Sequence, residues 1–273
     1  VKIQQYIRSN MKISHEVPKE LFEDSLKFND YDYALVHLFD KDPEYLQFYK
    51  NCVNNNRHVI LDNSIFELGE AYDNESFAKW VKELKPTEYI IPDALENLEK
   101  TCEQARLWVN DYNDLPGKKI GVVQGKNYFQ MVDCYQYLNR LGVDKIAISF
   151  DYSWYEQIVP HPNKYMSWML GRATLLTRLL KDGVINKSKP HHLLGCGLPQ
   201  EFSLYRGQEF DWIESLDTSN PIIHGLSFIP YKEYGLDSKQ TYKLADKINV
   251  QVSNAQRDII IDNIFKFRNY VNG

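Results

Sequence analysis

Val59-Ile60-Leu61-Asp62-Asn63-Ser64 is the stretch that decides the fold, because a short apolar run ends abruptly there in an acid, an amide and a hydroxyl. An apolar run of this length without polar alternation is typical of a strand buried on both faces of a parallel sheet. The same pattern returns in residues 90–93, 121–125, 146–149 and 213–217. Active sites of α/β barrels are built at the carboxyl ends of such strands. We therefore expect Asp62 to belong to a ring of polar groups at one rim.

Strand-like and helix-like segments alternate along the whole chain. The predicted strands are residues 11–18, 33–39, 58–64, 88–93, 119–124, 145–150, 191–197 and 212–217. The predicted helical segments are residues 20–28, 43–54, 76–84, 98–110, 128–141, 165–180, 200–205 and 254–270, the last after an irregular stretch at 221–239. This alternation predicts a parallel sheet, and eight units predict a closed (β/α)8 TIM barrel of the α/β class. A doubly wound open sheet is the second choice, although no G-x-G-x-x-G follows the first strand.

Composition narrows the class of protein. The chain has 273 residues, 43% hydrophobic and 25% charged, with no linker or low-complexity segment, so we expect one globular domain over residues 1–273. The net charge of -5 argues against a large nucleic-acid footprint but allows a local basic face. The start lacks a signal-peptide pattern and no apolar run is long enough for a membrane span, so we expect no membrane partner and a cytoplasmic location. The four cysteines form no C-x-x-C pair, which argues against a zinc knuckle.

In a barrel, the polar strand ends would meet at one rim. Asp62 and Asp217 are the acids that we weight most, since neither opens an evident helix. Asp93 has a second interpretation of equal weight, in which it is a helix N-cap or a turn residue. Two converging carboxylates are typical of acid/base catalysis or of nucleophilic attack at an anomeric carbon.

The succession of these segments resembles the tRNA-guanine transglycosylase family, the base-exchange enzymes of queuosine and archaeosine synthesis. The resemblance covers roughly residues 61–221, and G-V-V-Q-G is its most specific motif. The similar segments are Asp62-Asn63-Ser64-Ile65-Phe66-Glu67 to D-S-G-G-F-Q, Pro92-Asp93-Ala94 to the base-recognising aspartate, Gly121-Val122-Val123-Gln124-Gly125 to G-I-V-Q-G, Lys145-Ile146-Ala147-Ile148-Ser149 to Y-A-I-G-G, His192-Leu193-Leu194-Gly195-Cys196-Gly197 to Y-L-M-G-V-G, and Asp217-Thr218-Ser219-Asn220-Pro221 to the spacing of the D-C-V-x-P-T-R nucleophile motif.

The resemblance implies a mechanism and a set of roles. Asp217 would attack C1′ of a guanosine or deoxyguanosine, while Asp62 would act as general acid/base. The base would be flipped out of its stack, and a 7-deazaguanine derivative would replace guanine. The residues expected to bind the substrate base are Asp93, Gln124, Gly125, Ser149, Phe150, Gly197, Ser64 and Phe66. The residues expected to contact the polynucleotide are Lys126 and Asn220.

Departures from the family pattern favour DNA over tRNA. The family's zinc module has no counterpart, Pro221 is followed by isoleucines instead of Thr-Arg, and Ile148-Ser149 replaces the substrate-strand Gly-Gly. These changes resemble the compact phage-type members that place 7-deazaguanines into DNA, and a phage-encoded enzyme would act in the host cytoplasm. The expected partners are a polynucleotide and a free 7-deazaguanine base, with no cofactor and no metal, and a homodimer stays open.

Three other functions stay open beside DNA base exchange. They are base exchange on tRNA, a non-catalytic nucleic-acid-binding or partner subunit with a degenerate barrel, and an unrelated barrel enzyme acting on a small sugar or phosphate. The presence of both Asp62 and Asp217 favours an enzyme.

Some side chains receive structural predictions only. For His191-His192 we predict one buried and one exposed ring in preference to a metal site. Arg172 and Arg178 are predicted to lie mainly on a solvated helix face. The aromatic cluster at residues 152–155 fits either a base-stacking surface or a packed loop.

Overall fold

The structure, a computed structural model, describes residues 11–273. Residues 1–10 belong to the expected domain, and the start of the chain was expected to carry no signal peptide. These ten residues lie outside the described residues. The centre of the structure is a nearly closed, all-parallel sheet of eight strands in the order β1-β8-β7-β6-β5-β4-β3-β2. The predicted single-domain (β/α)8 TIM barrel is confirmed. The strands are β1 Lys12–Ser14, β2 Asp32–Leu35, β3 Val59–Asp62, β4 Glu88–Ile90, β5 Lys118–Val122, β6 Lys145–Ser149, β7 His191–Leu194 and β8 Ile213–Asp217.

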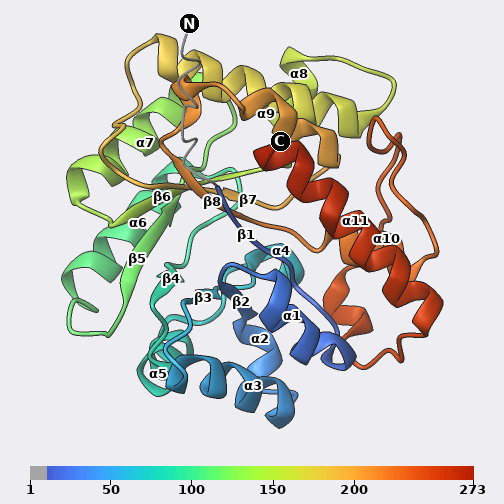
Figure 1. Cartoon of the computed structure of the whole chain (residues 1–273). Helices are drawn as coiled ribbons and strands as arrows, with labels where there is room; N and C mark the ends of the chain where they lie inside the picture. The colour runs from blue at the N-terminus through green and yellow to red at the C-terminus, as the bar shows by residue number, and fades with distance from the viewer. Residues whose placement is uncertain (1–10) are drawn as a thin grey trace, which may run out of the picture.

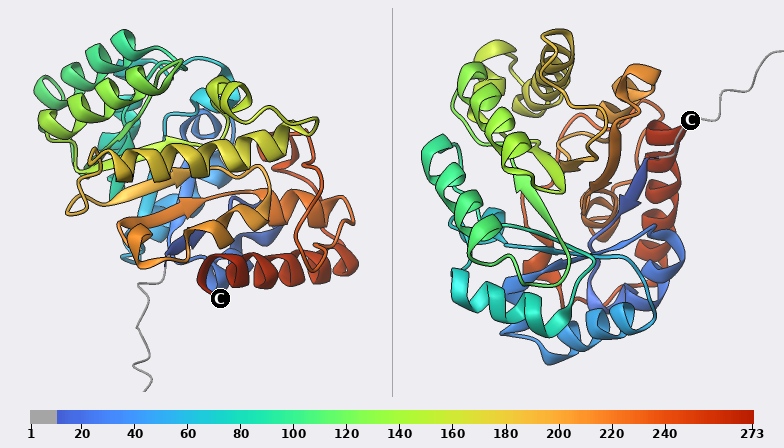
Figure 2. Two further views of the ribbon diagram at one scale, coloured as in Figure 1. Left: turned by 90° about the horizontal axis from the view of Figure 1, so that it is seen from above. Right: turned by 90° about the vertical axis from the view of Figure 1, so that its left-hand side faces the viewer.

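Helices surround the strands on the outside (Figures 1 and 2). Their bounds are α1 Phe22–Phe28, α2 Val36–Phe39, α3 Pro43–Asn54, α4 Ile65–Leu68, α5 Asn74–Leu84, α6 Leu98–Asn110, α7 Tyr128–Leu141, α8 Ser153–Ile158, α9 Lys164–Lys181, α10 Asn220–Leu226 and α11 Asn254–Asn272, with 3-10 turns η1 Lys19–Leu21, η2 Pro199–Tyr205, η3 Gln208–Phe210 and η4 Leu244–Lys247. The longer helices begin at polar N-caps such as Asn127 and Asn163, whose side chains accept from the first-turn N–H groups. No helix within residues 11–273 is long and apolar enough to cross a membrane.

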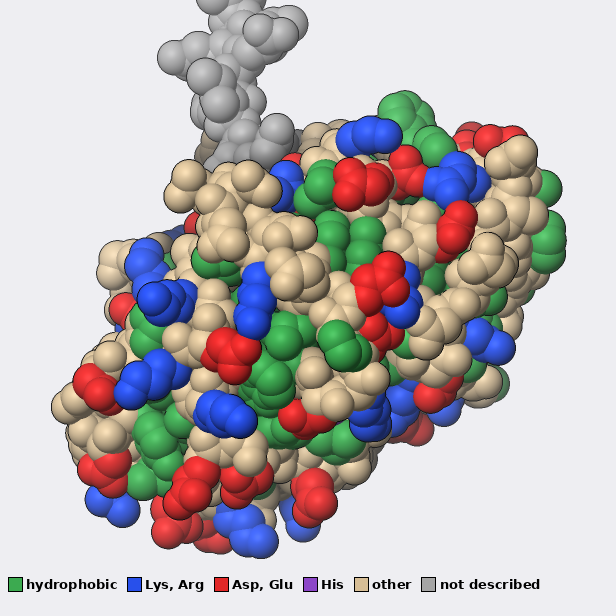
Figure 3. Space-filling model, turned by 90° about the horizontal axis from the view of Figure 1, so that it is seen from below, with side chains coloured by type: hydrophobic (Ala, Val, Ile, Leu, Met, Phe, Trp, Pro, Cys, Tyr) green, Lys and Arg blue, Asp and Glu red, His purple; other side chains and the backbone are tan. Residues whose placement is uncertain are grey.

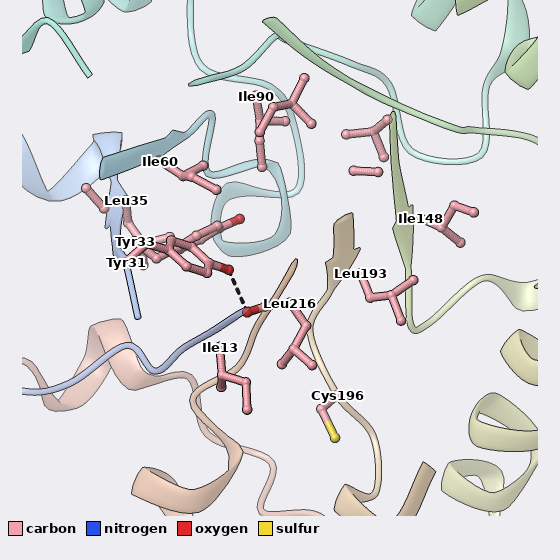
Figure 4. Close-up of a cluster of buried hydrophobic side chains, with 14 of the residues drawn as sticks. Ile13, Tyr31, Tyr33, Leu35, Ile60, Ile90, Ile148, Leu193, Cys196 and Leu216 are labelled. Atoms are coloured by element: carbon pink, nitrogen blue, oxygen red, sulfur yellow. Dashed lines mark hydrogen bonds between the residues drawn. The ribbon is translucent and has the colours of Figure 1, made fainter. Parts of the chain in front are cut away.

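Side chains and one backbone hydrogen bond close the seam between β1 and β2, which no backbone ladder joins. Asn29 accepts from His15 N at 2.8 Å and donates to His15 O at 2.9 Å. Asp30 donates its N–H to Ile13 O at 3.0 Å, and its carboxylate accepts from Ile13 N at 2.8 Å. Tyr31 then reaches across the barrel and donates its hydroxyl to Leu216 O at 2.5 Å (Figure 4). These contacts replace the missing strand pairing.

The barrel interior is filled with side chains, and a buried ion network lies at the amino ends of the strands. Ile13, Ile60 and Leu193 are among the buried side chains that Figure 4 shows pointing inward. Below them, Lys145 Nζ lies 2.5 Å from Glu88 Oε2 and 3.0 Å from Glu214 Oε2. Since these pairs lie at the amino ends, they stabilise the floor and leave the carboxyl-end rim for a site.

Two predicted segments have another type of secondary structure, and the short helices α4 and α8 were not predicted. Residues 33–39 were predicted as one strand, but the strand ends at Leu35 and Val36–Phe39 is the short helix α2. The reason is that a fully buried apolar run has the same pattern in a strand and in a buried helix. Residues 221–239 were predicted to be irregular, but residues 221–226 belong to α10, which begins at Asn220. Its N-cap Ser219 makes no side-chain cap hydrogen bond, so the usual start signal is missing.

Candidate functional site

A cavity of about 260 Å³ opens at the carboxyl ends of the strands. The predicted residues that line it are Asp62, Phe66, Asp93, Gln124, Ser149, Phe150 and Asp217. The N-cap interpretation of Asp93 is wrong, because the N-cap of the helix that follows it, α6, is Asn97. A closed barrel thus brings together acids that lie far apart in the sequence.

The other predicted site residues do not line this cavity. Ser64 is buried at a left-handed backbone position (φ 63°), and its N–H donates to the Asp62 carboxylate. Gly125 faces the first turn of α7, where an added Cβ would lie 2.8 Å from Gln130 Cβ. Buried Asn220 donates to Gly197 O at 3.1 Å, so this pair shapes the loop behind the wall. Lys126 is exposed outside the cavity.

Asp217 is anchored by a histidine that the sequence analysis did not assign. His192 is fully buried, with Nε2 2.9 Å from Asp217 Oδ1 and Nδ1 2.9 Å from Ser215 Oγ. A ring that donates from Nε2 to the carboxylate and accepts the Ser215 hydroxyl at Nδ1 satisfies all three groups. Asp217 is therefore oriented as a hydrogen-bond acceptor.

The histidine pair as a whole contradicts the prediction. Both His191 and His192 have 0% exposed surface, so the expectation of one exposed ring is wrong. In a barrel wall one strand residue points into the barrel and its neighbour points toward the helices, and here helices cover the outer face as well. His191 accordingly packs against Tyr135 and Trp212.

Asp62 is held in a different environment. Its carboxylate accepts from the Tyr33 hydroxyl and from Ser64 N–H. Burial, reinforced by the nearby Glu67 carboxylate, raises the pKa of Asp62 to about 8 despite these hydrogen bonds. The Tyr33 ring stacks on His192 with centroids 6.1 Å apart, so the supports of the two acids contact one another.

Three further acids line the cavity, Glu16, Glu67 and Asp151, and the sequence analysis gave none of them a role. Burial raises the pKa of Glu67 to about 7. Burial also raises the pKa of Glu16 well above its usual value, and repulsion from Glu67 and Asp217 adds to the shift. Glu16 lies just beyond the end of β1, and this polar strand end was the available signal. Burial therefore moves the titration of Asp62 and Glu67 into the neutral pH range.

An amide network surrounds Asp93. Asn63 donates to Asp93 Oδ1 at 2.8 Å and Gln124 donates to Oδ2 at 2.7 Å, while Gln124 Oε1 accepts from Glu96 N at 2.8 Å. Burial raises the pKa of Asp93 to about 6 against these two hydrogen bonds. The network holds the carboxylate rigidly at the cavity wall, where spare lone pairs remain for a ligand donor.

Cationic side chains line the same cavity, among them Lys239 and Lys243. Lys239 ends the stretch at 221–239 that was predicted to be irregular, and Lys243 follows shortly after it. Lys243 Nζ donates to the carbonyls of Phe66 and Glu67 at 3.0 and 2.9 Å. These bonds tie the stretch to α4. Burial lowers the pKa of Lys239. Among residues 11–273, no cluster of histidine, cysteine or acidic side chains has the arrangement of a metal site.

Comparison with known proteins adds no relative: no family model matches the chain, and no curated protein matches it. What the site can do therefore follows from its own chemistry. It places an acceptor carboxylate, Asp217, in one cavity with an acid whose pKa is about 8, Asp62. Pairs of carboxyl groups whose environments differ in this way serve as nucleophile or base and as general acid.

Proposed function

We propose that the chain is a base-exchange glycosyltransferase (a pentosyltransferase) that replaces guanine in a polynucleotide, DNA in preference to tRNA, with a 7-deazaguanine derivative. The observation that carries the proposal is the contrast between Asp217, held as an acceptor by buried His192, and Asp62, with its pKa raised to about 8. The order of the motifs around these acids, which resembles the guanine transglycosylases, supports the choice of reaction.

The first half-reaction would break the glycosidic bond. An oxygen of Asp217 attacks C1′ as the bond from C1′ to guanine N9 breaks, and the bonding electrons leave with the base. Protonated Asp62 supplies the proton that neutralises the departing guanine. The product is an ester between Asp217 and C1′, and the step as written balances with these two acids alone.

The second half-reaction would reverse these steps with another base. N9 of the incoming 7-deazaguanine attacks C1′, the ester bond breaks, and the N9 proton passes to the Asp62 carboxylate. Carbon at position 7 removes the basic nitrogen through which guanine is protonated as it leaves. The new base is therefore retained.

Base recognition would fall to the Asp93 network. Guanine presents N–H donors on the edge that carries its exocyclic amine, and a carboxylate held by Asn63 and Gln124 accepts such donors through its remaining lone pairs. Phe66 and Phe150 line the same cavity and offer apolar surface to the ring. The preference for DNA rests on the sequence alone, chiefly on the missing zinc module.

Labelled guanine offered to DNA and tRNA side by side tests the proposal. We expect incorporation into DNA, its loss in Asp217→Asn, and a glycosyl adduct on Asp217 detectable by mass spectrometry. Incorporation into tRNA alone would remove the DNA preference, and full activity in Asp217→Asn would contradict the nucleophile. An adduct on Asp62 would reverse the two roles.

A further inference from the structure

Three aromatic rings form a continuous strip along one side of the cavity. The centroids of Phe150 and Trp168 lie 5.5 Å apart, and those of Phe150 and Phe66 lie 5.8 Å apart. All three residues line the cavity. Phe66 is 44% exposed and Trp168 is half-buried, whereas Phe150 connects them from below. We call Phe66, Phe150 and Trp168 the aromatic strip.

Each ring of the aromatic strip carries a lysine. Lys164 Nζ lies 5.1 Å from the Trp168 centroid, Lys239 Nζ lies 4.2 Å from Phe150, and Lys243 Nζ lies 5.3 Å from Phe66. Lys243 is already bound to two backbone carbonyls. The ammonium groups of Lys164 and Lys239 make no ion pair or hydrogen bond with any of the residues the structure describes. Their N–H donors are therefore available to a ligand.

A short link holds these two lysines on the same side of the cavity. Asn163 caps α9 by accepting from Tyr165 N at 3.0 Å, and its side-chain amide donates to Asp237 O at 2.5 Å. Lys164 follows Asn163 directly, and Lys239 lies two residues after Asp237. Lys239 is partly buried, and a buried ammonium without a hydrogen-bond acceptor is costly, so its position favours an anionic ligand group. Lys164 is exposed.

Acidic and basic side chains share the lining of the cavity. Glu16, Asp62 and Asp217 repel phosphate, while Lys164 and Lys239 attract it. On the face shown in Figure 3, acidic and basic side chains are interspersed, without a broad basic patch. A phosphate backbone would therefore be guided locally, at the cavity mouth, and not by the net charge of -5.

We propose that the aromatic strip with Lys164 and Lys239 binds the single strand that flanks the target nucleotide. Neighbouring bases stack on Trp168 and Phe66, and a phosphate lies between the two lysines. This combination of rings and cations is how proteins bind unpaired strands with little sequence preference. The inference rests on the proposed function and adds to it that an unpaired strand, not a duplex, is the form that binds.

Fluorescence anisotropy with a labelled single-stranded oligodeoxynucleotide tests this subsite without requiring catalysis. In Lys164→Gln and in Lys239→Gln we expect weaker binding and a salt dependence whose log–log slope falls by about 0.7 for each phosphate that the variant no longer neutralises. Trp168→Leu should weaken binding about fivefold or more, and Trp168→Phe should restore most of it. Lys187→Gln, exposed in the turn before β7 at the amino ends of the strands, is the matched control and should bind like the wild type.

Three results would overturn the subsite: unchanged affinity and salt slope in both lysine variants, equal binding of the duplex, or equal binding of deoxyguanosine monophosphate. Failure of the proposed function is separable from these. Strip-dependent strand binding without any base exchange would contradict the exchange reaction alone. If base exchange occurs and strand binding is unchanged in the lysine and Trp168 variants, the subsite alone is contradicted.

Discussion

The hydrogen bond between His192 and Asp217 is the residue-scale feature with the greatest chemical consequence. In His192→Phe we expect kcat for base exchange to fall about tenfold to a hundredfold with little change in KM, because the variant removes a hydrogen bond to a charged group. His192→Gln, which keeps an N–H donor, should recover part of the rate. Steady-state kinetics and a thermal melt measure this. A rise in KM alone would contradict a role in orienting the carboxylate.

The protonation of Asp62 predicts a pH dependence of stability. Its folded-state pKa, about 8, lies above the ordinary 3.8, so the folded protein holds a proton that the unfolded chain releases. Stability from this group is present below pH 4 and is lost as the pH rises toward 8. Urea unfolding at pH 5 and pH 8 should show a smaller loss in Asp62→Asn than in the wild type. An equal loss in both would contradict the assignment.

Arg172 shows how far a single residue can depart from its pattern. Helix spacing predicted a solvated face, but Arg172 is fully buried, with Nε 2.6 Å from Glu201 Oε1 and its other nitrogens on the carbonyls of Leu194 and Gly195. That expectation is wrong, since α9 is covered on this side by η2. Arg178 is half-exposed, in agreement with the same prediction.

At the scale of elements, α10 and α11 pack too closely for any added side chain between them. A Cβ on Gly225 would lie 2.3 Å from Ile260 Cγ1 and 2.9 Å from the Ile260 backbone. We expect Gly225→Ala to lower the free energy of unfolding by about 1–3 kcal/mol through overpacking. Chemical denaturation measures this.

The control for this substitution lies on the outer face of α11. Ile261 is 54% exposed, so Ile261→Ala should change stability by no more than about 0.5 kcal/mol. An equal loss of stability in both variants would contradict the close packing of α10 on α11 as the source of the effect.

Helix α8 resolves an alternative that the sequence left open. Tyr152, Trp154 and Tyr155 are buried, and the last two belong to α8, packed beneath α9. An added Cβ on Gly171 of α9 would lie 2.3 Å from Tyr155 Cβ. The packed alternative is therefore the correct one.

At the scale of the whole molecule, closure of the barrel depends on Asn29. Asn29→Ala would leave both backbone groups of His15 buried without partners, and we expect a loss of about 2–4 kcal/mol in the free energy of unfolding. Hydrogen exchange should show faster opening of β1 than of β6. Asn51→Ala, on the exposed face of α3, should leave stability nearly unchanged. If β1 in Asn29→Ala keeps the hydrogen-exchange protection of the wild type, that result would contradict the role of Asn29 in closing the barrel.

The sequence by itself determined the barrel and the acids at its rim. Buried strands and helix faces have local periodicities, and a polar residue that ends an apolar strand is visible in a window of a few positions. Asp62, Asp93 and Asp217 were found in this way. Short buried segments such as α2 and α10 were not, because their apolar runs carry no distinguishing period.

Only the tertiary structure decided the partners of those acids. His192 orients Asp217 from a neighbouring strand, Tyr33 holds Asp62, and Lys239 returns over the cavity from a stretch with no regular pattern. Each of these contacts depends on which chain segments the closed barrel places side by side. The physical reason is that burial and mutual repulsion, which set the protonation of the acids, arise only when distant residues share one cavity.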